Sequence, residues 1–398
     1  MLIRKVRAFN GIVLALLVPF SIYNVVRGFT LATVFIILGV LLSINVLGVS
    51  VSLRRREIML FISIMILGAL SLILNSTEMW FNSTLYIHNQ FNICISFAAL
   101  IMLTSCSDFK SFIYSSIVLS VIASLICLYQ AFSIFLFGSF KANFYLPFLV
   151  VIRDVDTISE LRPCAFFTEP AHLCMYLAPV LYFLLSKHKY IVSILLLAAL
   201  IVSSSTTGLL LCVIIPSLFF YHNGIQVKRL LLIIAVFCFF YKSLMIYYPS
   251  LLEFAFSKLD ETDASSDLRL LGPLVYLPFF DLSHYMFGIG LNQMESFILY
   301  KRGALAFEGS GNYANSILYM FFSYGITGLI ILVTYLYQKH KMCIHSGAYM
   351  TILITILCTD QIIFSNSLVY LLSFVCFSGK LNNLDCIGEK NKLLCLLK

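Results

Sequence analysis

The chain has 398 residues, of which 61% are hydrophobic and 11% charged, and its formal net charge is +8. Soluble domains are about half apolar and a quarter charged, so this composition excludes an ordinary soluble protein and indicates a polytopic membrane protein. The positive charges form short clusters between apolar segments, which is typical of topology signals and not of a nucleic-acid-binding patch. We therefore expect no nucleic-acid partner.

Apolar segments recur from end to end, and they predict an all-α integral membrane protein with about 12 transmembrane helices in a single domain, 1–398. Arg4, Lys5 and Arg7 precede the first segment and no small-residue cleavage site follows it, so we expect an uncleaved first span. The expected segments are 8–26, 29–53, 58–75, 90–105, 111–138, 171–186, 190–203, 207–221, 230–248, 313–337, 343–358 and 361–378.

Two of the longest apolar stretches are expected to fold as helical hairpins. Residues 190–221 as one helix would extend about 48 Å, against a hydrocarbon core of roughly 30 Å. Basic residues flank the stretch on both sides, so both of its ends should be cytoplasmic and "SSSTTG" (203–208) should be the tip. The same logic makes "CTDQIIFSN" (358–366) a second tip, on which we expect Asp360 to be solvated.

This topology places both termini in the cytoplasm and leaves two long segments on the outer side. They cover residues 139–170 and 249–312, and both are too long to be simple connections. We therefore expect two large periplasmic loops, which would close over a shared cleft.

The first loop ends in "LRPCAFFTEPAH" (161–172). Pro170 suits the first turn of a helix, which puts Glu169 at or near the N-cap, beside the positive end of the helix dipole. Glu169 is then either a helix cap or part of a site with Arg162 and His172. His172 has its own alternative, a polar contact between helices.

The second loop carries Arg269, Lys301, Arg302 and His284. Basic residues beside a membrane also bind lipid headgroups, and that interpretation stays open for the three cations. An arginine near a carboxylate suits a phosphate-bearing substrate whose partner must lose a proton.

The sequence lacks the motifs that are typical of several other kinds of enzyme. It contains no C-x-x-C pair, zinc-ligand spacing, Walker A loop or G-x-S-x-G elbow. We expect neither a metal nor a cofactor. The apolar segments also lack the chains of ionisable residues that are typical of proton-coupled transporters.

Four motifs in order resemble the Wzy-type O-antigen polymerases of the O-antigen polymerase/ligase family. They are "LRPCAFFTEPAHLCMYLAP" (161–179), "SSSTTGLLL" (203–211), "SSDLRLLGPLVY" with "FGIGLNQ" (287–293), and "NSILYMFFSYGITGLIIL" (315–332). Their order and the topology around them make the set more specific than any one motif.

The resemblance implies a GT-C-like membrane glycosyltransferase of the bacterial inner membrane, active in lipopolysaccharide O-antigen biosynthesis. Such enzymes transfer a glycan from undecaprenyl diphosphate at the periplasmic face onto a sugar hydroxyl of a new undecaprenyl-diphosphate-linked repeat unit. The resemblance also implies contact with membrane lipids and a separate chain-length regulator protein.

Carried onto this chain, the resemblance implies that Arg162 and Arg269 bind the diphosphate and that Glu169 orients or deprotonates the acceptor hydroxyl. A helix N-terminus stabilises an ionised carboxylate and so weakens it as a base, which leaves His284 or His172 to take the proton. The candidates for further substrate contacts are Arg153, Lys141, Lys301, Arg302 and Asn315.

Two other functions stay open at this point. An O-antigen ligase would transfer the glycan to lipid A–core. A flippase or transporter would move lipid-linked oligosaccharides without chemistry, and it would be expected to contain internal repeats, which the sequence does not display.

Overall fold

The computed structural model describes residues 2–26, 29–47, 55–137, 150–151, 162–222, 272–303, 314–340 and 346–381. The helices of its first half are α1 (Leu2–Phe20), α2 (Leu31–Leu47), α3 (Arg55–Asn75), α4 (Ser83–Ala98), the π-helix η1 (Ala99–Leu103), α5 (Thr104–Cys106) and α6 (Phe109–Phe137). Those of its second half are α7 (Pro170–Ser186), α8 (Tyr190–Val202), α9 (Thr206–His222), the 3₁₀ helix η3 (Gly272–Phe279), α13 (Leu282–Phe287), α14 (Met294–Arg302), α15 (Ser316–His340), α16 (Ser346–Thr359) and α17 (Asn366–Leu381).

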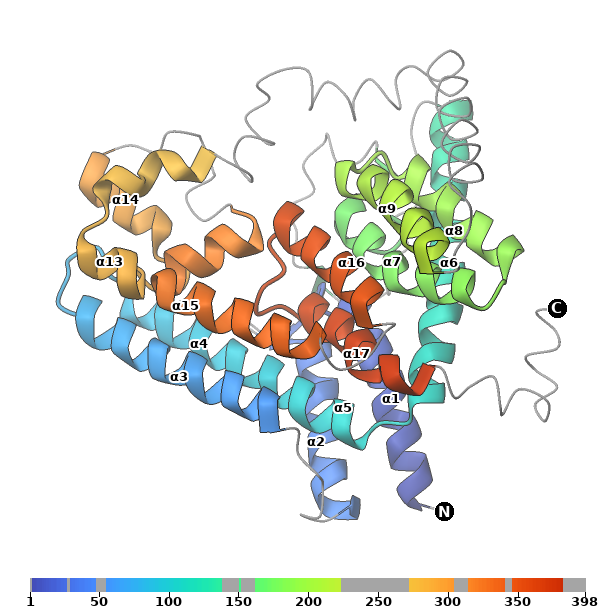
Figure 1. Ribbon diagram of the computed structural model, residues 1–398, viewed down its shortest axis with the longest axis horizontal. Helices are drawn as coiled ribbons and strands as arrows, with labels where there is room; N and C mark the ends of the chain where they lie inside the picture. The colour runs from blue at the N-terminus through green and yellow to red at the C-terminus, as the bar shows by residue number, and fades with distance from the viewer. Residues whose placement is uncertain are drawn as a thin grey trace.

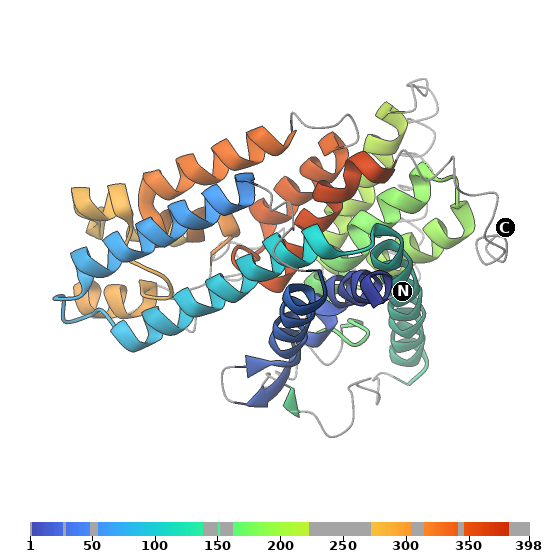
Figure 2. The same ribbon diagram turned by 90° about the horizontal axis from the view of Figure 1, so that it is seen from below.

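The helices are spread along the long axis of the molecule. Helices α3, α4 and α15 lie along one end, where α13 packs on α15, and α7, α8 and α9 lie at the other end (Figure 1). The view from below gives the same separation, with α16 and α17 between the two groups (Figure 2). Helices α16 and α17 both contact α7, so they join the two ends.

The prediction of an all-α membrane protein is confirmed in its main feature. Four described helices are long and apolar enough to cross a membrane, namely Arg55–Asn75, Ser83–Cys106, Phe109–Ile134 and Ser316–His340. Six further apolar helices have 10–17 residues. Every expected apolar segment contains a helix except 230–248, which lies outside the described residues.

Both predicted hairpins are confirmed as pairs of helices. The stretch 190–221 divides into α8 and α9, which pack on each other and are joined through Ser203–Ser205. The last apolar stretch divides into α16 and α17, also in contact.

A small sheet is the one departure from an all-helical chain among the described residues. Strand β1 (Tyr23–Val26) pairs antiparallel with β2 (Phe29–Thr30) and with β3 (Val150–Val151). The first expected segment, 8–26, is therefore helical only as far as Phe20, because the tyrosine and paired valines that follow favour a strand.

Helix α7 is the most buried helix of the described fold. All of its residues except His172 and Ser186 are buried, and it contacts α6, α8, α9, α16 and α17. A helix that is apolar on every side is stable only when it is enclosed. The N-terminus of α7 is therefore held in place by packing on all sides.

An ion pair between Glu57 of α3 and Lys339 of α15 is buried, with the two residues 1% and 4% exposed. Arg56 adds a hydrogen bond from its Nη1 to the carbonyl of Gln338 at 3.0 Å. The pair fixes the position of α15 along α3.

The contribution of this pair to stability can be tested by removing one partner or both. We expect Lys339→Met alone to destabilise the fold by about 3–5 kcal/mol, because the Glu57 carboxylate stays buried without its lysine. The double variant Glu57→Leu/Lys339→Met should recover most of that loss. Thermal unfolding of the protein in detergent would measure both, and equal losses in the two variants would contradict the prediction.

Two glycines let the backbone before α14 cross α15 at direct contact. Gly288 (φ 75°) faces Ser323, and Gly325 (φ 66°) faces Met286. A Cβ on Gly288 would lie 2.3 Å from the carbonyl carbon of Ser323, and one on Gly325 would lie 2.4 Å from that of Met286. The "FGIGLNQ" motif thus packs on the Gly-x-x-Gly motif of α15.

We expect Gly288→Ala and Gly325→Ala each to reduce the yield of folded protein sharply, because the new methyl group meets main-chain atoms. Gly303→Ala is the matched control: it also has positive φ (78°), but nothing lies within 4 Å. That variant should lose only about 1–2 kcal/mol from backbone strain. Size-exclusion profiles and melting temperatures in detergent would compare the three, and similar behaviour would count against the crossing.

Candidate functional site

One buried carboxamide anchors the segment that leads into α7. Gln130 of α6 accepts hydrogen bonds through Oε1 from the N–H groups of Cys164 (3.0 Å) and Ala165 (2.8 Å). Its Nε2 donates to the carbonyl of Ala165 at 3.1 Å. Gln130 is fully buried, so these bonds satisfy polar atoms that would otherwise be stranded. Segment 162–169 is therefore fixed on α6 before it enters the helix.

The predicted start of α7 is confirmed. Pro170 is its first residue and Glu169 is the N-cap residue, with extended backbone (φ −138°, ψ 147°). The Glu169 side chain makes no capping hydrogen bond, so a role as a plain helix cap does not account for it. Its half-buried carboxylate lies at the positive end of the helix dipole, where an ionised form is favoured.

Arg162 connects the same segment to the tip of the α8–α9 hairpin. Its Nη2 donates to the carbonyl of Ser204 at 3.0 Å. A guanidinium carries five N–H groups in a rigid plane, so a bond from one of them orients the rest. Two motifs that are about 40 residues apart in the sequence meet at this contact.

Asp360 is only 3% exposed, so the prediction that it is solvated was wrong. Its Oδ2 accepts hydrogen bonds from the hydroxyls of Thr207 (2.7 Å) and Thr359 (3.1 Å). Its backbone carbonyl accepts from the N–H (3.0 Å) and hydroxyl (2.6 Å) of Ser316. A carboxylate can be buried when such bonds replace its water, and here the hydroxyl donors to it come from α9 and α16.

Arg162 and Asp360 thus hold two ends of one hairpin tip, at Ser204 and Thr207. Both charged groups are also within electrostatic range of Cys174 in α7. The motifs 161–179, 203–211 and 315–332 therefore converge on this tip.

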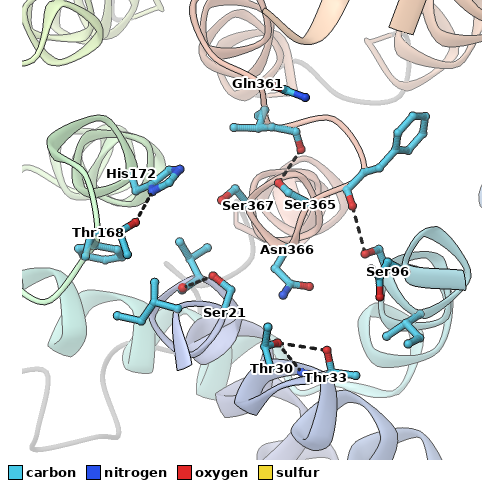
Figure 3. A pocket seen from close by; sticks show the side chains of 17 residues that line it. Ser21, Thr30, Thr33, Ser96, Thr168, His172, Gln361, Ser365, Asn366 and Ser367 are labelled. Carbon is cyan, nitrogen blue, oxygen red and sulfur yellow. Dashed lines mark hydrogen bonds between the residues drawn. The ribbon is translucent and has the colours of Figure 1, made fainter. Parts of the chain in front are cut away.

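A cavity of about 340 Å³ opens beside this cluster, between the ends of several helices (Figure 3). Thr168 and His172 form one side, where the Thr168 hydroxyl and His172 Nδ1 are 3.0 Å apart. The loop before α17 forms the opposite side, with Asn366 pointing into the space (Figure 3). His172 therefore faces a cavity and is not enclosed between helices.

His284 lies elsewhere, in α13 at the end of the molecule opposite α7 (Figure 1). Its ring is 7% exposed and is surrounded by Trp80, Phe280 and Phe297, with ring centroids 5.3–6.0 Å away. Burial lowers the pKa of His284, and Lys301 lowers it further, against the opposing effect of Asp281 and Glu78. The neutral ring accepts the N–H of Asp281 at 3.3 Å, which secures the start of α13.

The other candidates are distributed over both ends of the molecule. Lys301 and Arg302 close α14, next to His284, where the Lys301 ammonium lies 6.0 Å from the centre of the Phe297 ring. Asn315 is buried and accepts the N–H groups of Ile317 and Leu318, which caps α15. Three predicted candidates, Arg269, Arg153 and Lys141, lie outside the described residues.

Arg162, Glu169 and His172 therefore lie in the segment that leads into and begins α7, whereas His284, Lys301 and Arg302 lie at the other end of the molecule (Figure 1). The described parts of the two long loops do not share a cleft. Within the described ranges, no group of three or more His, Cys, Asp or Glu side chains is arranged to hold a metal ion.

Left-handed backbone marks the edges of this site. Ala165 (φ 56°), Ser204 (φ 50°) and Phe364 (φ 63°) are non-glycine residues in a conformation that costs about 1–3 kcal/mol each. One is in the anchored segment, one accepts the Arg162 bond, and one lines the cavity. Such strain persists only where the surroundings enforce it, and it is frequent at functional sites.

Replacing Gln130 tests whether the segment depends on this one side chain. We expect Gln130→Leu to release Cys164, which is 7% exposed, because two backbone N–H groups lose their buried acceptor. Maleimide labelling read by mass spectrometry should then modify Cys164 in the variant and not in the original protein. Gln90→Leu, at a half-buried glutamine of α4, is the control. Protection of Cys164 in both variants would contradict the anchoring role.

Comparison with known proteins supplies the family. No curated protein matches the chain significantly. The family model described as WcaD colanic acid polymerase matches residues 5–378, which is nearly the whole chain and includes every residue of the site described above. The chain therefore belongs to this family, a Wzy-type family of O-antigen and polysaccharide polymerases.

Proposed function

We propose that this protein polymerises oligosaccharide repeat units carried on undecaprenyl diphosphate, at the periplasmic face of the bacterial inner membrane. The observation that carries the proposal is the family match over residues 5–378, since a polymerase of this kind is a glycosyltransferase. The match favours a polymerase over the ligase and the flippase. About twelve spans, a GT-C-like architecture and a separate chain-length regulator belong to the same proposal.

The proposed side of the membrane is supported by the two hairpins. Their tips touch through Thr207 and Asp360, so the tips lie on one side of the membrane. Basic residues flank the open ends of both hairpins, and such residues favour the cytoplasm. The tips, with Arg162 bonded to one of them, would then face the periplasm.

The proposed chemistry is the attack of an acceptor sugar hydroxyl on the anomeric carbon of the donor glycan. The new glycosidic bond forms as the bond to the diphosphate breaks, and the diphosphate leaves on its lipid. Arg162 would stabilise the charge that develops on the leaving phosphate, because its planar donors suit phosphate oxygens.

The hydroxyl proton would pass to a group at the same end of the molecule as Arg162. His172 lines the cavity and Glu169 is three residues before it, whereas His284 is enclosed by aromatic rings at the other end. We assign the proton to the Glu169–His172 pair and not to His284. An imidazole ring nitrogen can accept such a proton and is suited to this step.

Complementation of a deletion strain tests this function. We expect the deletion to leave surface glycan with a single repeat unit, and the original gene to restore the ladder of longer chains on a gel. Arg162→Ala and Glu169→Gln should reduce polymer about 10- to 100-fold, as the loss of a charge-assisted hydrogen bond in the transition state implies.

Matched variants separate loss of function from loss of protein. Arg55→Ala and Glu78→Gln remove exposed charges of the same kinds elsewhere in the chain and should restore full ladders. All four variants are compared at equal membrane abundance, measured by immunoblot. A deletion strain without any repeat unit on its core lipid would instead indicate a ligase or a flippase, and full ladders from all variants would remove Arg162 and Glu169 from the site.

A further inference from the structure

The wall of the cavity carries many uncharged polar side chains beside its apolar surface. Small-molecule sites of about 300–1,000 Å³ are mostly apolar, with few polar groups. Here eleven of the seventeen lining residues carry a hydroxyl, amide or imidazole group, and none is Asp, Glu, Lys or Arg. The eleven are Ser21, Thr30, Thr33, Asn92, Ser96, Thr168, His172, Gln361, Ser365, Asn366 and Ser367.

This lining disfavours the diphosphate that a lipid-linked substrate would bring. A diphosphate would find no cationic side chain among the lining residues, since Arg162 is not one of them. An uncharged ligand with many hydroxyl groups can donate hydrogen bonds to the polar side chains of this wall and accept hydrogen bonds from them.

Several lining hydroxyls are already occupied by the fold and so shape the cavity. Ser21 donates to the carbonyl of Val18 at 2.7 Å, and Ser96 donates to that of Phe364 at 3.3 Å. Thr30 and Thr33 share a bond of 3.1 Å. These contacts fix the wall, and each hydroxyl oxygen still has lone-pair capacity for a ligand donor.

Asn366 differs from these hydroxyl-bearing residues because its side chain is not used by the fold in the described part of the chain. It is the first residue of α17, it is half-buried, and its carboxamide points into the middle of the cavity (Figure 3). Within the described residues its side chain has no hydrogen-bond partner. A carboxamide offers an acceptor and two donors in one plane, which matches the alternating hydroxyls of a sugar ring.

The cavity is also next to the proposed chemistry. Thr168 and His172 belong to the segment that carries Arg162 and Glu169, and His172 forms part of the wall opposite Asn366 (Figure 3). A sugar held by Asn366 would present a hydroxyl on the side of His172, while the phosphate-binding guanidinium stays outside the lining.

From this geometry we propose that the cavity binds the non-reducing terminal sugar of the acceptor repeat unit, that this sugar is uncharged, and that the Asn366 carboxamide is a principal contact. The assignment of this sugar to the acceptor rests on the proposed function. The donor reacts at its reducing end, which carries the diphosphate. No lysine or arginine among the described residues lines this cavity to bind that diphosphate, so the acceptor sugar is the better match.

A binding assay tests the proposal on the full-length protein in detergent. The probe is a set of oligosaccharides from partial acid hydrolysis of the strain's own surface polysaccharide, each labelled at its reducing end with a fluorophore. Fluorescence polarisation should give saturable binding to the original protein. Asn366→Asp, which is nearly isosteric, should weaken it about tenfold or more, as the loss of one ligand hydrogen bond implies. Asn89→Ala, outside the cavity, should bind normally.

The label separates the two possible sources of the sugar. A reducing-end label leaves an acceptor terminus free and blocks a donor terminus. Binding of the labelled probe that Asn366→Asp and Asn366→Ala both weaken supports the proposal. Affinity equal to that of the original protein in both Asn366→Asp and Asn366→Ala, or binding only of oligosaccharides whose reducing end is unlabelled, overturns it.

The polymer ladder of the deletion strain tests the proposed function separately. If the ladder is lost on deletion but Asn366 variants bind normally, the function stands and the cavity assignment fails. If sugar binding depends on Asn366 but the deletion leaves the ladder unchanged, the cavity remains a sugar site and its role as an acceptor site is overturned.

Discussion

Gln130 is fully buried in α6, and its carboxamide makes three hydrogen bonds to the backbone of the segment that leads into α7. Much of the site follows from this carboxamide. It sets the left-handed turn at Ala165, and that turn determines where the Arg162 guanidinium and the Glu169 carboxylate emerge. Because α7 is enclosed on every side, the segment has a rigid element to join. The Gln130 side chain thus orients the segment before α7, whereas the candidate reactive groups belong to that segment and to α7 itself.

The site is divided between charge and neutral polarity. Arg162 and Asp360 are bonded to the two sides of one hairpin tip, whereas the adjoining cavity is lined by hydroxyls and amides without a carboxylate or a cation. A substrate that is anionic at one end and a neutral glycan at the other matches this division. Electrostatic attraction would position the phosphate, and short-range hydrogen bonds would select the sugar.

Local signals in the sequence were sufficient for part of this arrangement. Pro170 and Glu169 mark the start of α7 because a proline favours the first helical turn, and the polar run at 203–208 marks a hairpin tip because one helix would be too long for a membrane. Asp360 and His284 could not be placed in this way. The partner that buries Asp360 is Thr207, 153 positions away, and the aromatic rings around His284 come from two other segments. Burial by distant residues leaves no local pattern.

The crossing of Gly288 and Gly325 has a consequence for how this chain can vary. In most packed contacts a larger side chain on one element can be accommodated by a smaller one on its neighbour. At this crossing each glycine faces a main-chain carbonyl carbon of the opposite segment. A main-chain atom is the same in every residue, so no substitution can make it smaller. A substitution at either position therefore cannot be compensated at the other. The contact between the segment before α14 and the middle of α15 can be lost in evolution, but single changes elsewhere cannot restore it.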